Sequence, residues 1–309
     1  ATRAVVIAAS PGRGIRHAFY RRGQPLAMSD DDKYPGESGR RRFVKGVVGG
    51  GALAGVGATG AVSVNSLTTA SGAGGGTVTA KVVENTAGPA PRGMPQIPIE
   101  IDDEGNIKGV WPEVKDKKVQ GITIKIAETE DYKGSGVTYT QEWFQYCGLQ
   151  ANNGLKPTYE SDNYFKSDGG TKYAWQQEAL SGGDKINIDD LSDYEEWGNG
   201  IGKSGIGKPA MATWRSGDSE NPIPVNVIRS DIIEEAAQDN DWLAASTDRG
   251  VIAYLNKCSH FCCVPGFKTN SGSAKYGGED KIYCQCHQSV YDPYSIVDAI
   301  YTALPRPAE

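Results

Sequence analysis

The sequence predicts an all-β protein whose C-terminal part, residues 205–309, forms a small antiparallel β domain. Short segments alternate apolar and polar side chains with the two-residue period of strands, or form brief apolar runs, and turn-forming residues lie between them. The 309 residues include 6 Trp, 15 Tyr and 6 Phe, which are enough large side chains to furnish a core. A wholly disordered chain is therefore excluded.

The predicted elements follow one another along the chain. The strands are expected at residues 97–101, 119–126, 210–214, 223–228 and 251–255. Asp248-Arg249-Gly250 is typical of a tight turn and predicts a hairpin between a strand at 242–245 and the strand at 251–255. Residues 188–194 and 230–237 predict short helices.

The charge distribution separates the beginning of the chain from the rest. The net charge is −6, but residues 1–45 hold ten Lys and Arg against four Asp and Glu. The remainder therefore carries 22 basic and 34 acidic residues. An acidic body excludes sequence-independent binding of nucleic acid, and the composition excludes a polytopic membrane protein. A basic head before an acidic body suggests a targeting segment.

Residues 1–27 are arginine-rich and irregular, and we interpret them as a non-native upstream extension because Met28 opens a different composition. Residues 28–65 contain Arg40-Arg41-Arg42-Phe43-Val44-Lys45, followed by 35 residues without charge. This pattern resembles a twin-arginine export signal, and the apolar stretch is long enough to be retained as a membrane anchor helix. The alternative is a basic patch beside a buried Gly-rich helix.

Residues 66–92 are rich in Gly, Ser, Thr and Pro and predict a flexible linker, with an extended arm on the domain surface as the alternative. Residues 93–204 are an insertion or part of a base domain, and their role does not follow from the sequence. Cys147 lies alone in this segment and is expected to be a small buried side chain without a role.

Most of the metal-ligating residue types gather near the C-terminus in two boxes. The boxes span residues 258–263, Cys-Ser-His-Phe-Cys-Cys, and residues 284–289, Cys-Gln-Cys-His-Gln-Ser. A tetrahedral zinc site could use two Cys and two His, but this spacing is not that of a zinc finger and leaves further cysteines unexplained. A disulfide framework would account for the cysteines but not for the matched histidines.

The two boxes resemble the Rieske iron–sulfur family, whose motifs are C-x-H-x-x-C and C-x-C-H-x-S. The resemblance implies a Rieske-type antiparallel β sandwich at 205–309 with a small cluster-binding subdomain, and one [2Fe–2S] cluster per chain. It implies that Cys258 and Cys284 ligate one iron and that His260 and His287 ligate the other, with a disulfide between Cys263 and Cys286. The acidic body with its Cys262-Cys263 pair is similar to Rieske proteins of halophilic archaea.

Further residues are assigned by the same resemblance. Ser289 and Tyr291 stand where quinol-oxidising members have hydroxyls that donate hydrogen bonds to the cluster and its sulfur ligands, which raises the reduction potential. The alternative is that Ser289 caps a loop and Tyr291 packs in the core. Gln288 and Cys262 replace residues that are commonly glycine, so Cys262 is expected as a free thiol or a competitor for the bridge. A proline-containing loop covers the cluster in the family, and residues 303–307 are the candidate here.

The implied function is that of an electron-transfer subunit of a quinol–cytochrome c reductase. His260 and His287 would be the catalytic pair that meets quinol. The partners would be a cytochrome b-type subunit and a cytochrome or copper-protein acceptor, on the extracytoplasmic face of a membrane. Alternatives are the Rieske subunit of a membrane-bound nitrate reductase or arsenite oxidase, a soluble Rieske ferredoxin, and a zinc-stabilised binding module without redox activity.

Overall fold

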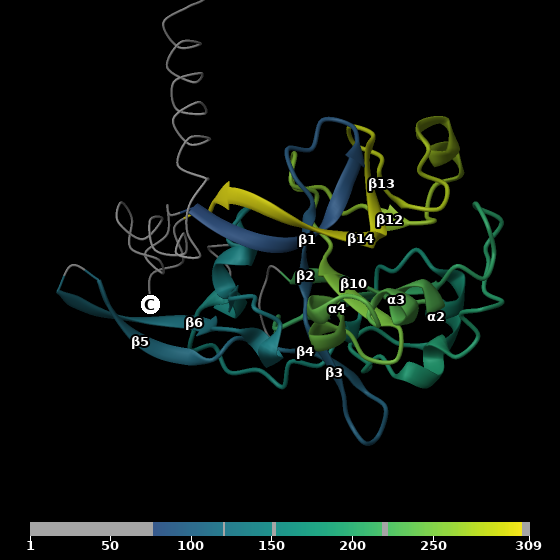
Figure 1. The fold of residues 1–309 in the computed structure, drawn as a ribbon. Helices are drawn as coiled ribbons and strands as arrows, with labels where there is room; N and C mark the ends of the chain where they lie inside the picture. Colours follow the sequence, from purple (N-terminus) through teal and green to yellow (C-terminus); the bar gives the residue numbers. More distant parts are fainter. Residues whose placement is uncertain (1–76, 120, 150–152, 218–221, 305–309) are drawn as a thin grey trace, which may run out of the picture. The chain divides into compact units, whose positions relative to one another are not determined.

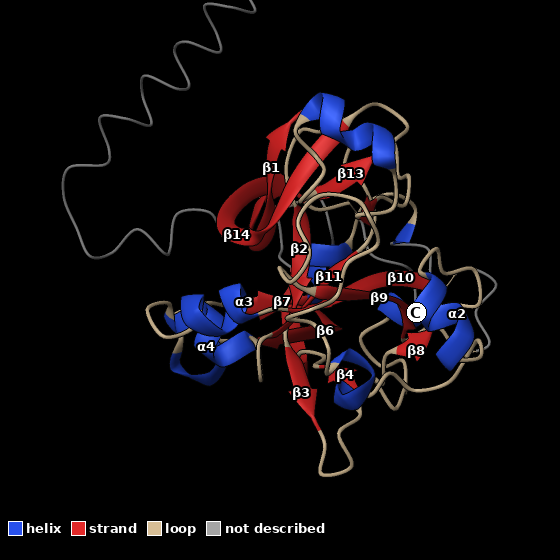
Figure 2. Ribbon diagram, turned by 90° about the vertical axis from the view of Figure 1, so that its right-hand side faces the viewer, coloured by secondary structure: helices blue, strands red, loops and turns tan. Residues whose placement is uncertain are grey.

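The computed structural model describes residues 77–119, 121–149, 153–217 and 222–304, and these residues are mostly β with a few short helices (Figures 1 and 2). The predicted upstream extension at 1–27 and the predicted signal and anchor at 28–65 lie outside the described residues. Within the described part of the chain, no helix is long and apolar enough to cross a membrane.

One curled antiparallel sheet of nine strands organises the fold, in the order β12-β13-β14-β1-β2-β11-β10-β9-β8. Its strands are β1 (Thr77–Ala87), β2 (Met94–Ile97), β8 (Lys166–Ser167), β9 (Lys208–Trp214), β10 (Ile223–Arg229), β11 (Val251–Leu255), β12 (Gly266–Phe267), β13 (Ile282–Cys284) and β14 (Ser289–Thr302). The predicted strands at 210–214, 223–228 and 251–255 are confirmed as β9, β10 and β11. The all-β class is confirmed for the described residues.

Strand β1 corrects the prediction of a linker at 66–92. β1 pairs with β14 along almost its whole length, from Thr77 opposite Thr302 to Ala87 opposite Val290 (Figure 1). Val78, Ala80 and Val82 alternate inward and are buried. Every second residue is therefore apolar in a stretch whose overall composition looks like a linker, and this period outweighs the composition. Residues 66–76 of the predicted linker lie outside the described residues.

Two smaller sheets lie beside the main one. The first pairs β3 (Ile99–Ile101) with β4 (Ile107–Gly109), and the second has the order β5 (Val114–Val119), β6 (Ile122–Thr129) and β7 (Tyr139–Thr140). The sequence predicts one strand at 119–126, but a turn splits this segment between β5 and β6. Gly121 in that turn has a φ of +84°, a conformation that glycine adopts without steric cost.

The helices of the described residues are short. They are the α-helices α2 (Ala174–Ala179), α3 (Asp231–Ala236) and α4 (Asp241–Ser246), and the 3₁₀ helices η2 (Tyr132–Gly134), η3 (Gln141–Phe144), η5 (Asn153–Leu155), η6 (Ile188–Leu191) and η7 (Ser271–Tyr276). The predicted helix at 230–237 is confirmed as α3, and η6 occupies part of 188–194. The predicted strand at 242–245 is wrong, because these residues form α4. The Asn240 side chain caps that helix by accepting a hydrogen bond from the Leu243 N–H at 3.0 Å.

The segment 93–204 is part of the packed core. Trp143 and Phe144 of η3 are fully buried. The Trp143 ring lies 5.1 Å from the Tyr139 ring and 5.5 Å from the Trp242 ring, measured between centroids. β2 and β8 from this segment are strands of the main sheet. The segment therefore supplies a fixed support directly beside β11, the strand that leads into the first cysteine box.

Candidate metal centre

The two boxes are held at the ends of strands. Residues 258–263, called loop 1 here, follow β11, and residues 284–289, called loop 2, turn the chain from β13 into β14. Loop 1 is closed by backbone hydrogen bonds from the Cys258 N–H to the Cys263 carbonyl at 2.8 Å and from the Cys262 N–H to the Cys258 carbonyl at 3.0 Å. In loop 2 the Gln288 N–H donates to the Cys284 carbonyl at 2.9 Å.

Two of the six cysteines remain free thiols, Cys258 and Cys284, and both are about 1% exposed. The two sulfurs interact, and this interaction lowers the pKa of Cys258 and raises that of Cys284. Backbone N–H groups of His260 and Phe261 also point at the Cys258 sulfur and favour its thiolate. Cys258 is therefore the thiol that loses its proton more readily, and the thiolate is the form that ligates a cation.

The two histidines of the boxes lie together. Their ring centroids are 4.8 Å apart, with the rings nearly perpendicular. The His287 side chain is exposed, whereas the Nδ1 atom of His260 is buried and has no hydrogen-bond partner. A buried polar atom without a partner is rare in folded proteins. The unpaired nitrogen of a neutral imidazole is also the atom that binds a transition metal.

Tyr291 and Ser289 take different positions relative to the thiols. The buried Tyr291 hydroxyl lies 3.0 Å from the Cys258 sulfur. Burial and this contact raise the pKa of Tyr291, so the hydroxyl stays protonated and is placed to donate a hydrogen bond to the sulfur. The buried Ser289 hydroxyl instead accepts a hydrogen bond from the Ala90 N–H at 3.2 Å. Among the described residues, no hydrogen bond joins Ser289 to a cysteine sulfur.

A disulfide connects the two loops. Cys263 and Cys286 are bonded, with Cα atoms 6.7 Å apart, which is the pair that the resemblance implies. The sulfur atoms of Cys263, Cys284 and Cys286 all lie within 4.8 Å of one another. Two of these sulfurs are bonded to each other, so the three do not form a metal site of their own. The disulfide instead lies directly beside the free thiol of Cys284.

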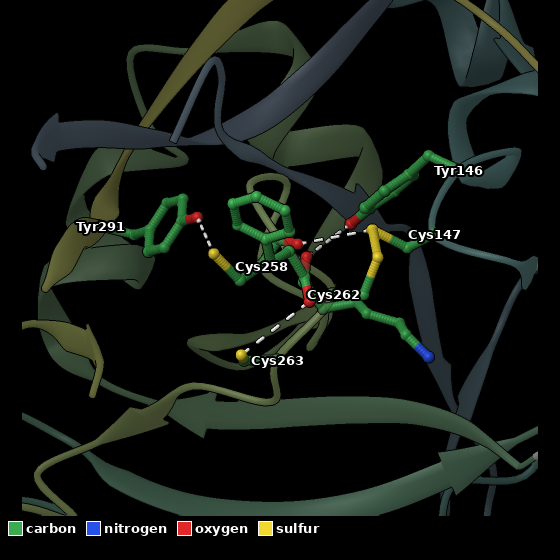
Figure 3. The surroundings of a disulfide bond; sticks show 8 residues. Tyr146, Cys147, Cys258, Cys262, Cys263 and Tyr291 are labelled. Atoms are coloured by element: carbon green, nitrogen blue, oxygen red, sulfur yellow. Dashed lines mark hydrogen bonds between the residues drawn. A yellow bond between two sulfur atoms is a disulfide. The ribbon is translucent and has the colours of Figure 1, made fainter. Parts of the chain in front are cut away.

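A second disulfide, which the sequence analysis missed, joins Cys147 to Cys262 (Figure 3). Cys147 was expected to have no role, and Cys262 to be free or to compete for the other bridge; both expectations are wrong. The signal that could have found this bond is arithmetic. Six cysteines, less two ligands and one expected disulfide, leave one further pair.

A proline-containing segment other than the predicted one packs on loop 2. Residues 88–92, Gly-Pro-Ala-Pro-Arg, lie against it: a Cβ on Gly88 would approach the Cα of Ser289 to 2.5 Å. Gly88 also has a φ of +87°, so glycine is required for both reasons. The Ser259 hydroxyl of loop 1 donates to the Arg92 carbonyl. The candidate of the sequence analysis, residues 303–307, is described only to Leu304, whose N–H donates to the Gln145 carbonyl at 3.0 Å.

An apolar surface surrounds the exposed histidine. Phe261 is 65% exposed, and its ring centroid lies 4.3 Å from that of His260 and 5.0 Å from that of His287. Val264 is 41% exposed nearby in the chain. Single exposed apolar residues are ordinary, but here an exposed aromatic ring contacts both imidazoles, at interplanar angles of 64° and 40°.

The two boxes supply a pair of buried thiols and a pair of imidazole rings that contact each other. Backbone N–H groups of His260 and His287 point at the sulfurs of Cys258 and Cys284, respectively, and the Tyr291 hydroxyl contacts the Cys258 sulfur. No family model, no curated protein and no solved structure matches this chain.

Proposed function

We propose that this protein binds a Rieske-type [2Fe–2S] cluster through Cys258, Cys284, His260 and His287 and serves as the electron-transfer subunit of a respiratory oxidoreductase. The main observation in support of the proposal is the division of the six cysteines between disulfides and free thiols. Four are bonded in disulfides, and the two that stay free are buried, with backbone N–H groups of His260 and His287 pointing at their sulfurs and with the Nδ1 of His260 unpaired. Two thiolates and two imidazoles are the donor set of a Rieske centre.

The residues present fit such a cluster. Thiolates favour a ferric ion because they carry charge, and neutral imidazoles leave the other iron easier to reduce. The backbone N–H groups aimed at Cys258, together with the Tyr291 hydroxyl, stabilise negative charge on that sulfur. The cluster, when bound, would supply one-electron transfer between a quinol and a cytochrome or copper-protein acceptor.

The surface histidine is suited to exchanging a proton. An imidazole that ligates through one nitrogen keeps its second nitrogen for a proton, and the exposed His287 presents that nitrogen to solvent or to a bound molecule. The exposed Phe261 ring contacts both imidazoles and adds an apolar surface beside them. These residues support quinol as the electron donor, because its oxidation releases a proton with each electron.

The remaining parts of the proposal follow from the chain upstream of the fold. We expect export by the twin-arginine route and attachment to the extracytoplasmic face of the membrane, beside a cytochrome b-type subunit. Two disulfides agree with an oxidising compartment, since such bonds are rare in the reducing cytosol. A nitrate reductase or an arsenite oxidase remains the alternative assembly, and the donor and acceptor distinguish it from the first.

An EPR redox titration of the purified protein tests the proposal. We expect a rhombic signal from the reduced protein and a midpoint in the upper part of the Rieske range, which extends from about −150 to about +300 mV. The matched control is Cys258→Ser, which removes one thiolate and should remove the signal. A protein that contains zinc instead of iron and gives no signal would refute the assignment.

A further inference from the structure

The backbone at the Cys147–Cys262 disulfide is strained at both ends. Cys147 has a φ of +55° and Cys262 a φ of +64°, in the left-handed region that side chains other than glycine adopt rarely. Residues persist in such conformations only where the surrounding structure fixes them, and they gather at functional sites. We attribute the left-handed backbone conformation of Cys262 to its disulfide with Cys147. The two Cα atoms are 5.2 Å apart.

The partner segment is a firm support. Cys147 follows η3, whose Trp143 and Phe144 are fully buried. The Tyr301 hydroxyl of β14 donates to the Trp143 carbonyl at 2.5 Å, which ties the segment to the main sheet. The disulfide thus joins loop 1 to a part of the core that is 115 residues away in sequence.

Two further contacts connect this support to the base of loop 1. The Tyr146 hydroxyl donates to the Lys257 carbonyl at 2.8 Å, immediately before the first ligand (Figure 3). The Cys147 sulfur lies 3.5 Å from the Cys258 carbonyl oxygen, a contact rather than a hydrogen bond because the bonded sulfur has no proton. Together with the disulfide, these contacts hold residues 257, 258 and 262 against one segment.

Adjacent residues of loop 1 are consequently held from two directions. Cys262 is bonded to the core segment and Cys263 to loop 2. His260 lies between the ligand Cys258 and these two anchors, and its Nδ1 is buried without a partner. The imidazole is therefore carried by a short turn that is fixed at both of its ends.

We propose that the Cys147–Cys262 disulfide is a positioning pair that holds the turn carrying His260 in its ligand-binding conformation whether or not iron is present. The inference rests on the proposed function, because it concerns the same four ligands. A loop that is already ordered loses little conformational entropy when it ligates a metal, so the pair slows the loss of iron. The Cys263–Cys286 disulfide alone would join the two loops to each other but not to the core.

The test compares the parent protein with the double variant Cys147→Ser/Cys262→Gly, in which glycine suits the left-handed backbone at 262. The matched control is Tyr194→Phe, which removes a tyrosine hydrogen bond to Asp231 at 2.7 Å that plays no part in holding loop 1 and leaves the disulfide intact. We expect the double variant to release iron to a ferric chelator at least about tenfold faster than the parent, as for other residues that orient metal ligands. The control should release iron at the parent rate.

EPR line shape separates positioning from general destabilisation. A mobile His260 turn should broaden the g-features of the double variant, whereas a merely less stable fold should leave their width unchanged. Equal rates of iron release in the parent and the double variant would overturn the proposal.

Hydrogen exchange keeps the inference testable if the double variant does not fold or if the parent binds no iron. In the parent, the amides of Cys258 and Cys262 are hydrogen-bonded within loop 1 and should be protected equally with and without iron. Protection that appears only after iron is bound would contradict a preformed turn. A parent that binds no iron but shows protected amides would refute the proposed function and leave the positioning of the loop standing.

Discussion

The two cysteine boxes provide the same kinds of ligand but are held in different ways. Loop 1 is fixed by contacts with distant segments: Cys147 forms a disulfide with Cys262, and the Arg92 backbone carbonyl accepts a hydrogen bond from the Ser259 hydroxyl. Loop 2 is the connection of a hairpin, and residues 285–288 are exposed. The comparison indicates a division of roles, in which loop 1 locates the centre within the fold and loop 2 presents His287 at the surface.

A matched pair of positions makes the difference concrete. Each loop has a residue other than glycine in the left-handed region where the Rieske motif commonly has glycine, Cys262 at φ +64° and Gln288 at φ +65°. The strain is therefore similar in the two loops, at about 1–2 kcal/mol each. Cys262 offsets it with a disulfide to the core, whereas Gln288 is exposed. The same left-handed backbone conformation therefore allows a disulfide to the core in loop 1, whereas in loop 2 it only forms a turn.

The largest expected effect is the loss of iron when a candidate cysteine ligand is replaced in either loop. Cys258→Ser in loop 1 and Cys284→Ser in loop 2 should each reduce the iron content from about two per chain to nearly none, because a hydroxyl does not replace a buried thiolate. Iron analysis and the visible spectrum measure the loss. Retention of both irons in either variant would contradict the ligand assignment.

Gly88→Ala tests how strongly loop 2 depends on residues 88–92. The new Cβ would lie 2.5 Å from the Cα of Ser289, and φ at this position is +87°. We expect the free energy of unfolding to fall by about 3 kcal/mol or more, from the clash and the strain together. Chemical denaturation measures it. Gly277→Ala is the control, since φ there is +67° but no atom lies within 4 Å of a Cβ, so it should lose only about 1 kcal/mol.

Tyr291→Phe removes the donor that reaches from β14 to the loop 1 thiolate. Loss of one hydrogen bond of about 1 kcal/mol to a sulfur ligand should lower the midpoint potential by roughly 40–60 mV, since a one-electron couple shifts by about 59 mV for each tenfold change. Tyr283→Phe, in the neighbouring strand β13, is the control and should leave the potential unchanged. An unchanged potential in Tyr291→Phe would show that the 3.0 Å contact does not tune the centre.

The smallest expected effect is a change in the free energy of unfolding when the two left-handed residues, Gln288 and Cys262, are each replaced by glycine. Gln288→Gly should raise the free energy of unfolding by about 0.5–1 kcal/mol, because glycine relieves the left-handed strain in an exposed loop. Cys262→Gly should lower it in spite of the same relief, because the disulfide is lost. Chemical denaturation of the two variants and the parent measures these changes. Stabilisation by both substitutions would mean that the disulfide does not contribute to the free energy of unfolding.

The candidate ligands could be named from the sequence because the two boxes are defined by local spacing, and their role as ligands stays a prediction. The boxes lie at strand ends, so four residues within two short segments determine which atoms meet. The class of fold was predictable for a similar reason, since β9, β10 and β11 are apolar runs bounded by turns. A run such as 242–245 is ambiguous by itself, and Asn240 as the cap of α4 was the local signal for a helix.

The support of the site could not be predicted in the same way. The Cys147–Cys262 bond spans 115 residues, and no spacing rule connects its two ends. Residues 88–92 have the composition of a linker, and only the register of β1 against β14 shows that they reach loop 2. Contacts between distant segments depend on the sheet order, which follows from packing and not from any one stretch of sequence.

The course of β1 also has a mechanical consequence. The strand extends over 11 residues from Thr77 to the turn at Gly88 that presses on loop 2, and it is paired with β14 along this length. A force applied upstream of Thr77 acts along the strand axis. It places all the hydrogen bonds between β1 and β14 under shear at the same time, instead of breaking them one after another. Tension on the N-terminal side would therefore be transmitted about 36 Å, at about 3.3 Å per residue, to the turn that packs against the exposed loop.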